Sequence, residues 1–178
     1  MVLGSETVVA NRWITLRRDR CETGRGIRVA DYYVVEKRDF AMAVALTEGD
    51  ELILVRQYKH GIGRVVVECP AGYIDDGEEA VSAVERELRE ETGYRCDRVI
   101  PLAVVDVSPA VLTNRAHLFL CLGAERVAEQ QLDATEDIEV LSVPFDAVVQ
   151  GLLDGSFEVD LASAAAILLA RQWLSRER

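Results

Sequence analysis

Alternating apolar and polar positions divide the chain into a strand-rich first part and a mixed second part. Before residue 70, β-branched and aromatic residues between turn signals predict strands at residues 7–16, 27–36, 41–46, 51–58 and 65–68. Residues 48–50 suit a hairpin turn and residues 61–63 a loop. Later strands are expected at residues 98–107, 116–122 and 138–143, and helices near residues 145–153 and 161–175. This order predicts a mixed sheet between helices.

Helical spacing is clearest between residues 78 and 92. Val81, Val84 and Leu88 fall at i, i+3 and i+7, which predicts one buried stripe. Gly77 precedes this helix, and Gly93 stands where a left-handed C-terminal cap is expected.

The last predicted helix, at residues 161–175, is apolar nearly all round and is therefore expected to be largely buried. Asp160 or Ser163 is expected to start it.

Length and composition favour one soluble globular domain with an N-terminal extension. The chain has 178 residues, of which 49% are hydrophobic and 29% charged. No stretch reaches the roughly 18 apolar residues of a membrane span, and the charged N-terminus lacks a signal-peptide apolar region. These features predict a cytoplasmic protein that does not enter a membrane.

Charge and cysteine usage exclude other classes. A net charge of −11 argues against binding to nucleic acid, since that binding depends on Lys and Arg neutralising phosphates. Cys21, Cys69, Cys96 and Cys121 are widely scattered, which predicts reduced, structural cysteines.

Three acidic residues lie where a helix does not favour them. Glu87 and Glu91 are four residues apart and share a face, with Glu90 beside them, so their charges repel. The last turn of a helix is also the negative end of its dipole. A bound Mg²⁺ or Mn²⁺ would reverse both penalties. The alternative is a solvated acidic face with ordinary ion pairs, such as Arg86 with Glu90.

The spacing of these acids matches a known motif. Residues 72–94 fit Gly-x5-Glu-x7-Arg-Glu-(apolar)-x-Glu-Glu-x-Gly-(apolar), and every specified place is filled: Gly72, Glu78, Arg86, Glu87, Leu88, Glu90, Glu91, Gly93 and Tyr94. The segment resembles the box of Nudix hydrolases. That resemblance implies an α/β Nudix fold, in which a mixed sheet lies in an α/β/α sandwich and the box forms a loop, a helix and a loop. Residues 41–178 would then form the hydrolase domain, after an N-terminal β extension at residues 1–40.

Other segments resemble the ADP-ribose and ADP-sugar pyrophosphatase subfamily. They are residues 55–60, 68–72, 136–140 and 165–174, with Pro109 sixteen residues after Gly93. The resemblance implies Mg²⁺-dependent hydrolysis of ADP-ribose or a related nucleoside diphosphate sugar to a nucleoside monophosphate and a sugar phosphate, with Mn²⁺ as a substitute ion. It also implies a homodimer whose N-terminal strands reach the partner subunit.

The same resemblance implies substrate-binding residues, each with a structural alternative. Trp13 would meet the adenine ring, or else lie in the core or the dimer interface. Lys59 stands where relatives have Arg for phosphate, and Arg56 is the other basic candidate or a structural strand residue. Pro109 is a subfamily sign that would be a loop proline on its own. Asn114 stands where several relatives carry a substrate-contacting Glu, which leaves the sugar open.

For the metal, the resemblance implies that Glu87 and Glu91 bind it together with the backbone carbonyl of Ala71. Glu90 would ligate or orient, and Arg86 would steer the glutamates. The general base would come from the loop before residue 138.

For that base, Glu136 is favoured by register. Asp133 competes with it because some relatives place the base two residues before Glu136, where this chain has Ala134. A box glutamate is the third choice.

Two rival functions stay open. One is a Nudix hydrolase of another nucleotide: GDP-mannose, NADH, a dinucleoside polyphosphate or an oxidised nucleoside triphosphate. The other is a non-catalytic ADP-ribose sensor, which the intact set of box glutamates disfavours.

Overall fold

The computed structural model describes residues 1–177, and they divide into two compact units. The first unit is Met1–Asp39 with Asp106–Arg115, and the second is Phe40–Val105 with the residues from Ala116 onward. Each unit is described separately.

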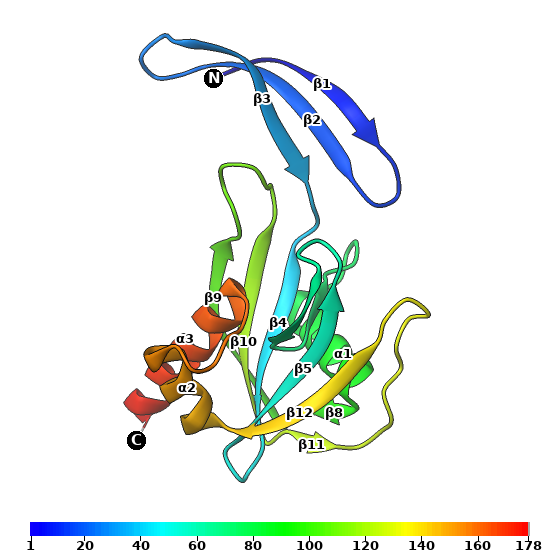
Figure 1. Cartoon of the computed structure of the whole chain (residues 1–178), viewed down its shortest axis with the longest axis vertical. Coiled ribbons are helices and arrows are strands. Elements are labelled where there is room, and N and C mark those ends of the chain that lie inside the picture. The colour runs from blue at the N-terminus through cyan, green and yellow to red at the C-terminus, as the bar shows by residue number, and fades with distance from the viewer. Residues whose placement is uncertain (178) are drawn as a thin grey trace. The chain divides into compact units, whose positions relative to one another are not determined.

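The first unit is built on a three-stranded antiparallel sheet of β1 (Val2–Ala10), β2 (Thr15–Glu22) and β3 (Arg28–Glu36), in the order β1-β2-β3 (Figure 1, blue strands). The predicted single strand at residues 7–16 is wrong. Asn11 breaks it, because its Oδ1 accepts hydrogen bonds from the backbone N–H groups of Trp13 (2.8 Å) and Ile14 (3.1 Å).

The second unit contains a seven-stranded mixed sheet. Its central order is β12-β5-β4-β10-β9, with β6 paired to β5 and β7 paired to β4, and the β4–β10 pair is parallel. The strands are β4 (Phe40–Leu46), β5 (Glu51–Lys59), β6 (Arg64–Glu68), β7 (Ala71–Tyr73), β9 (Arg98–Asp106), β10 (Arg115–Leu122) and β12 (Ile138–Pro144). A separate two-stranded pair joins β8 (Tyr94–Arg95) to β11 (Glu125–Arg126).

The centre of this sheet is forked. β4 and β5 pair at Ala45–Ile53 and Leu46–Leu52, close to their connecting turn. Farther along, β7 pairs with β4 and β6 pairs with β5. The chain passes from one arm of the fork to the other through Cys69 and Pro70, so the end of β6 and the start of β7 flank the opening.

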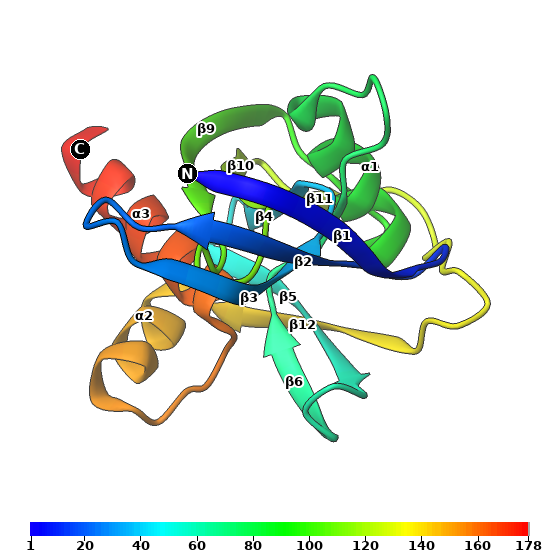
Figure 2. The same ribbon diagram turned by 90° about the horizontal axis from the view of Figure 1, so that it is seen from above.

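Helices cover both faces of this sheet, as Figures 1 and 2 show. α1 (Ala80–Thr92) packs on the face of β4 that carries Ala41, Ala43 and Ala45. α2 (Phe145–Asp154) and α3 (Leu161–Glu177) lie on the other side, where the Ser163 hydroxyl is 3.9 Å from the sulfur of Met42. The predicted mixed sheet between helices is confirmed.

Burial on two helices differs from the prediction. Val81 is 44% exposed, and the buried stripe of α1 follows Val84, Leu88 and Glu91 instead. In α3, the sheet covers only a narrow stripe, made of Ser163, Ala166, Ile167 and Ala170.

The remaining turn and cap predictions are confirmed. Asp160 caps α3 with its carboxylate, which accepts hydrogen bonds from the N–H groups of Ala162 (3.2 Å) and Ser163 (3.0 Å). In the turn between β4 and β5, the residue with positive φ is Asp50.

All four cysteines are free. Among residues 1–177, no helix combines the length and the apolar character that crossing a bilayer requires.

Candidate active site

Two box glycines permit close contacts around α1. A Cβ on Gly72 in β7 would overlap the carboxylate of Glu87. Gly93 ends α1 with a φ of 75° and donates its N–H to the carbonyl of Arg89 at 2.8 Å. A Cβ on Gly93 would also overlap the carbonyl oxygen of Ala128. Glycine at position 72 therefore leaves room for the Glu87 carboxylate, and glycine at position 93 leaves room for the loop at Ala128.

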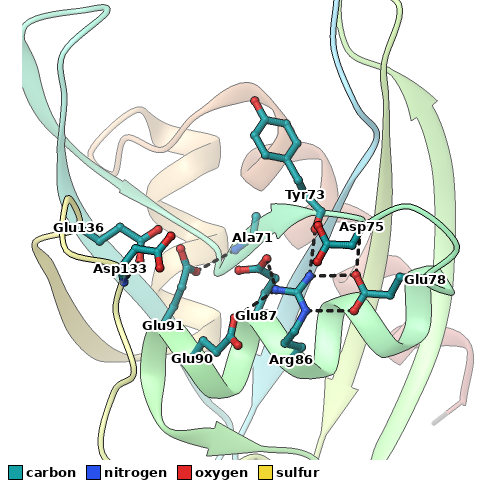
Figure 3. A network of polar contacts seen from close by, with 10 residues as sticks. All are labelled: Ala71, Tyr73, Asp75, Glu78, Arg86, Glu87, Glu90, Glu91, Asp133 and Glu136. Atoms are coloured by element: carbon teal, nitrogen blue, oxygen red, sulfur yellow. Dashed lines mark hydrogen bonds and ion pairs between the residues drawn. The ribbon is translucent and has the colours of Figure 1, made fainter. Parts of the chain in front are cut away.

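Arg86 connects the acids of α1 to the loop before it (Figure 3). Its guanidinium donates to both carboxylate oxygens of Glu78, at 3.0 and 2.9 Å, and to the carbonyl of Tyr73 at 3.0 Å. It also donates to Glu87 at 2.6 Å and to Glu90 at 3.1 Å. The hydrogen bonds from Arg86 lower the pKa of Glu78 to about 2. One side chain thus fixes the directions of three carboxylates.

Glu91 is the most deeply buried acid of the group, with 6% of its surface exposed. Its Oε2 accepts a hydrogen bond from the backbone N–H of Ala71 at 3.0 Å. Burial raises the pKa of Glu91 to about 8, and the charges of Glu87, Glu68 and Glu136 act in the same direction. Burial also raises the pKa of Glu87. Glu91 therefore lacks compensating positive charge, and the ion pair of Glu87 with Arg86 does not fully offset the burial of Glu87.

The loop between β11 and β12 brings Glu136 toward these acids. The charge of Glu136 contributes to the raised pKa of Glu91, and its Oε2 accepts a hydrogen bond from the N–H of Asp133 at 2.9 Å. Both loop acids are exposed. Gln130 anchors the loop, because its Nε2 donates to the backbone carbonyls of Glu91 (2.7 Å) and Ile138 (3.0 Å).

The donor set fits a divalent cation. In residues 1–177, no group of three or more Asp, Glu, His or Cys side chains is already gathered as a metal site, and Arg86 binds Glu87 and Glu90. However, buried carboxylates with raised pKa values are hard oxygen donors whose charge a cation would compensate. Glu91 meets β7 at Ala71, the residue whose carbonyl was predicted as a further ligand.

The two basic candidates of β5 lie on opposite faces of the strand. Lys59 shares the alternation of Ile53, which packs against α1, and its ammonium is 2.6 Å from the carboxylate of Glu68. Arg56 has the opposite orientation and binds Glu139 of β12, its partner in register. Only Lys59 therefore continues the face on which α1 lies.

The other predicted substrate residues belong to the first unit. The Trp13 ring is 69% exposed, with the guanidinium carbon of Arg12 4.4 Å from its centre. Pro109 lies in the segment between β9 and β10. Asn114 is buried, and within the described part of the chain its Oδ1 has no hydrogen-bond partner. The part of these three residues in a site stays a prediction.

Sequence reasoning missed two residues that the structure connects to this site. Glu68 was noted only within a resembling segment, and Gln130 was not considered. No local sequence pattern points to either residue, because each contacts residues that are not its neighbours in sequence. Glu68 contacts Lys59, and Gln130 contacts Glu91 and Ile138.

Two family descriptions match consecutive parts of the chain. The NUDIX domain matches residues 37–160, and the nucleoside diphosphate sugar hydrolase N-terminal domain matches residues 2–35.

Individual proteins are similar over most of their length. An ADP-ribose pyrophosphatase of Bacillus subtilis (strain 168) is 27% identical over 93% of this chain and 89% of its own. A methanol dehydrogenase activator of Bacillus methanolicus is 26% identical over 82% of this chain and 79% of its own. The crystal structure of an ADP compounds hydrolase aligns with a TM-score of 0.86 and 25% identity, covering 99% of this chain and 95% of the other.

The family predicted from residues 72–94 is confirmed by these matches. With the NUDIX domain spanning residues 37–160 and the box running from β7 through α1 to the start of β8, the chain belongs to the Nudix family.

Proposed function

We propose that this protein hydrolyses the pyrophosphate bond of ADP-ribose or a related nucleoside diphosphate sugar. The products are a nucleoside monophosphate and a sugar phosphate. The observation that carries the substrate class is the match of residues 2–35 to the N-terminal domain of nucleoside diphosphate sugar hydrolases, directly before the NUDIX domain. The B. subtilis relative and the aligned crystal structure, both with ADP compounds in their names, support the same class.

The chemistry rests on the acids of α1. Glu87, Glu90 and Glu91, with the carbonyl oxygen of Ala71, would hold the divalent cation, for which we propose Mg²⁺, with Mn²⁺ as a substitute. When bound, the cation supplies neutralising charge for the phosphoryl oxygens and a lowered pKa for coordinated water. Arg86 holds the carboxylates of Glu87 and Glu90 on one side of α1.

Glu136 is our candidate for the residue that takes the proton of the attacking water. Support comes from its position, because its charge contributes to the raised pKa of both Glu87 and Glu91. The carboxylate of Glu136 is exposed, so a substrate can reach it. Asp133 stays the competing candidate.

The remaining proposed contacts are with the phosphates, the base and the sugar of the substrate. Lys59 offers a point charge to the pyrophosphate. Arg56 would act only after leaving Glu139, because its guanidinium is held in that ion pair. Trp13 would stack on the base, while Pro109 and Asn114 would lie near the sugar.

We also propose a homodimer formed through the first unit. Its sheet leaves large apolar side chains exposed, among them Val8, Val9 and Tyr33 at 47%, 41% and 46% exposure. A three-stranded sheet with this much exposed apolar surface is expected to pack on a partner. We also propose a cytoplasmic location.

A substrate panel tests this function. Purified protein is incubated with ADP-ribose, other ADP-sugars, GDP-mannose, NADH, a dinucleoside polyphosphate and nucleoside triphosphates, with Mg²⁺, Mn²⁺ or EDTA. We expect AMP and ribose 5-phosphate from ADP-ribose, and no turnover in EDTA. Release of pyrophosphate from triphosphates, without turnover of any nucleoside diphosphate sugar, would reject the proposal.

A further inference from the structure

Glu68 is the last residue of β6, and one of its carboxylate oxygens holds two neighbours on β5. The Oε1 atom accepts a hydrogen bond from the amide of Gln57 at 2.6 Å and lies 2.6 Å from the ammonium of Lys59. Only 14% of the Glu68 side chain is exposed, against 43% for Lys59. The carboxylate of the pair is therefore largely buried, whereas the ammonium is open to solvent.

This arrangement follows from the fork in the sheet. Gln57 and Lys59 are two residues apart on β5 and point to the same face. Glu68 stands at the end of the β6 arm, and Ala71, which binds Glu91, begins the β7 arm three residues later. Glu68 also lies near enough to Glu91 to contribute to its raised pKa. The segment 68–71 thus contacts Lys59 through Glu68 and contacts Glu91, the proposed metal ligand, through Ala71.

Restraint matters more for lysine than for arginine. A lysine side chain loses much rotamer entropy when it is fixed, and its ammonium lacks a rigid fork that would orient it. An ammonium carries three donors, and the pair with Glu68 leaves others for phosphate oxygens. The loss of rotamer freedom can therefore occur on folding instead of on substrate binding.

We propose that Glu68 is a positioning residue that holds the Lys59 ammonium toward the substrate pyrophosphate. The inference rests on the function proposed above and adds a residue outside the box to the substrate site. Glu68 itself does not touch the substrate.

The first test uses two substitutions of Glu68 that separate position from charge. Glu68→Gln removes the charge, and Glu68→Asp keeps it but withdraws the carboxylate by one methylene. For hydrolysis of ADP-ribose, we expect both variants to raise KM by about tenfold and to change kcat by less than about threefold, because ground state and transition state lose the same contact. A wild-type KM in Glu68→Asp, or a lowered KM in Glu68→Gln, would overturn the proposal.

A double-mutant cycle shows whether Glu68 acts through Lys59. Lys59→Met alone should raise KM, and adding Glu68→Gln to it should change KM by less than about twofold. Additive effects would mean that Glu68 acts by another route. Lys59→Arg should retain most of the affinity, since a guanidinium can bind the same carboxylate.

Glu158→Gln is the matched control for stability of the β5–β6 hairpin. Glu158 pairs with Arg64 of β6 through exposed side chains, with 3.2 Å between the nearest atoms. This variant should keep the wild-type KM. An inactive wild-type protein would refute the proposed function, whereas an active wild-type protein with an unchanged Glu68→Gln would refute only the role of Glu68.

Discussion

Two glutamates of the same box have opposite protonation behaviour, because their surroundings differ. Hydrogen bonds from Arg86 bring the pKa of Glu78 to about 2, whereas burial brings that of Glu91 to about 8. Glu78 is thus a permanent anion that binds Arg86. Glu91 is an acid that becomes an anion at low cost only when positive charge reaches it.

This difference predicts an unusual pH dependence of stability without metal. Between the ordinary pKa of 4.5 and the folded-state value of about 8, folded Glu91 keeps a proton that the unfolded chain has released. The folded state binds more protons, so the free energy of unfolding falls as pH rises through this window, by up to about 1.4 kcal/mol per pH unit.

Urea unfolding in EDTA from pH 5 to pH 8 measures this fall. Glu91→Gln cannot ionise, so its stability should be flatter over the same window. Added Mg²⁺ should stabilise wild type more at pH 8 than at pH 5, because the cation binds the ionised form. An equal pH dependence in wild type and Glu91→Gln would exclude this account of Glu91.

At the scale of elements, the loop from β11 to β12 owes its position to one amide. Gln130 joins the end of α1 to the start of β12 through two backbone carbonyls. Replacing it with Leu leaves both carbonyls without that donor, a loss of about 1–3 kcal/mol. We expect faster hydrogen exchange at residues 131–137 and about a tenfold lower kcat, because Glu136 is less well placed.

Gln131→Leu is the control for this prediction, since Gln131 holds α1 with its backbone N–H, which donates to the carbonyl of Glu90 at 2.8 Å. In a Glu136→Gln background, Gln130→Leu should cost less than about twofold in kcat. A full tenfold loss there would show that the loop acts independently of Glu136.

Much of the second unit could be predicted, because its strands are short apolar runs between strong turn signals. The box helix and its C-terminal cap at Gly93 followed from spacing alone. Val81 was predicted to be buried because it matches the helical spacing of Val84 and Leu88. The helix instead buries the polar Glu91 together with those two residues and leaves Val81 exposed. Periodicity counts apolar residues only and cannot register a buried acid.

The fork of the sheet could not be predicted either. It depends on which strand β6 and β7 pair with, and these pairings are not encoded in hydrophobic patterns. Strand alternation separates Lys59 from Arg56, but which face of β5 meets α1 was not predicted from the sequence. The Asn11 side chain, which divides β1 from β2, was overlooked as a turn signal.

At the scale of the whole molecule, the exposed apolar surface of the first unit predicts a dimer. Sedimentation equilibrium at micromolar concentration should give twice the chain mass of 19.7 kDa. Val9→Asp should shift the protein toward the monomer, since it puts a charge on the exposed apolar surface. Thr47→Asp, at the turn between β4 and β5 in the second unit, serves as a comparison that should leave the mass unchanged. A wild-type protein of single-chain mass would contradict the dimer.

The kcat of Glu91→Gln with ADP-ribose and Mg²⁺ shows whether the α1 acids catalyse pyrophosphate hydrolysis. The Gln side chain can still accept the hydrogen bond from the N–H of Ala71, so the variant should fold and keep a Tm close to that of wild type. We predict a fall in kcat of about 100-fold or more, while Glu85→Gln, on the exposed face of the same helix, should stay within about twofold. Near-normal turnover by a folded Glu91→Gln would mean that Glu91 has no part in the reaction.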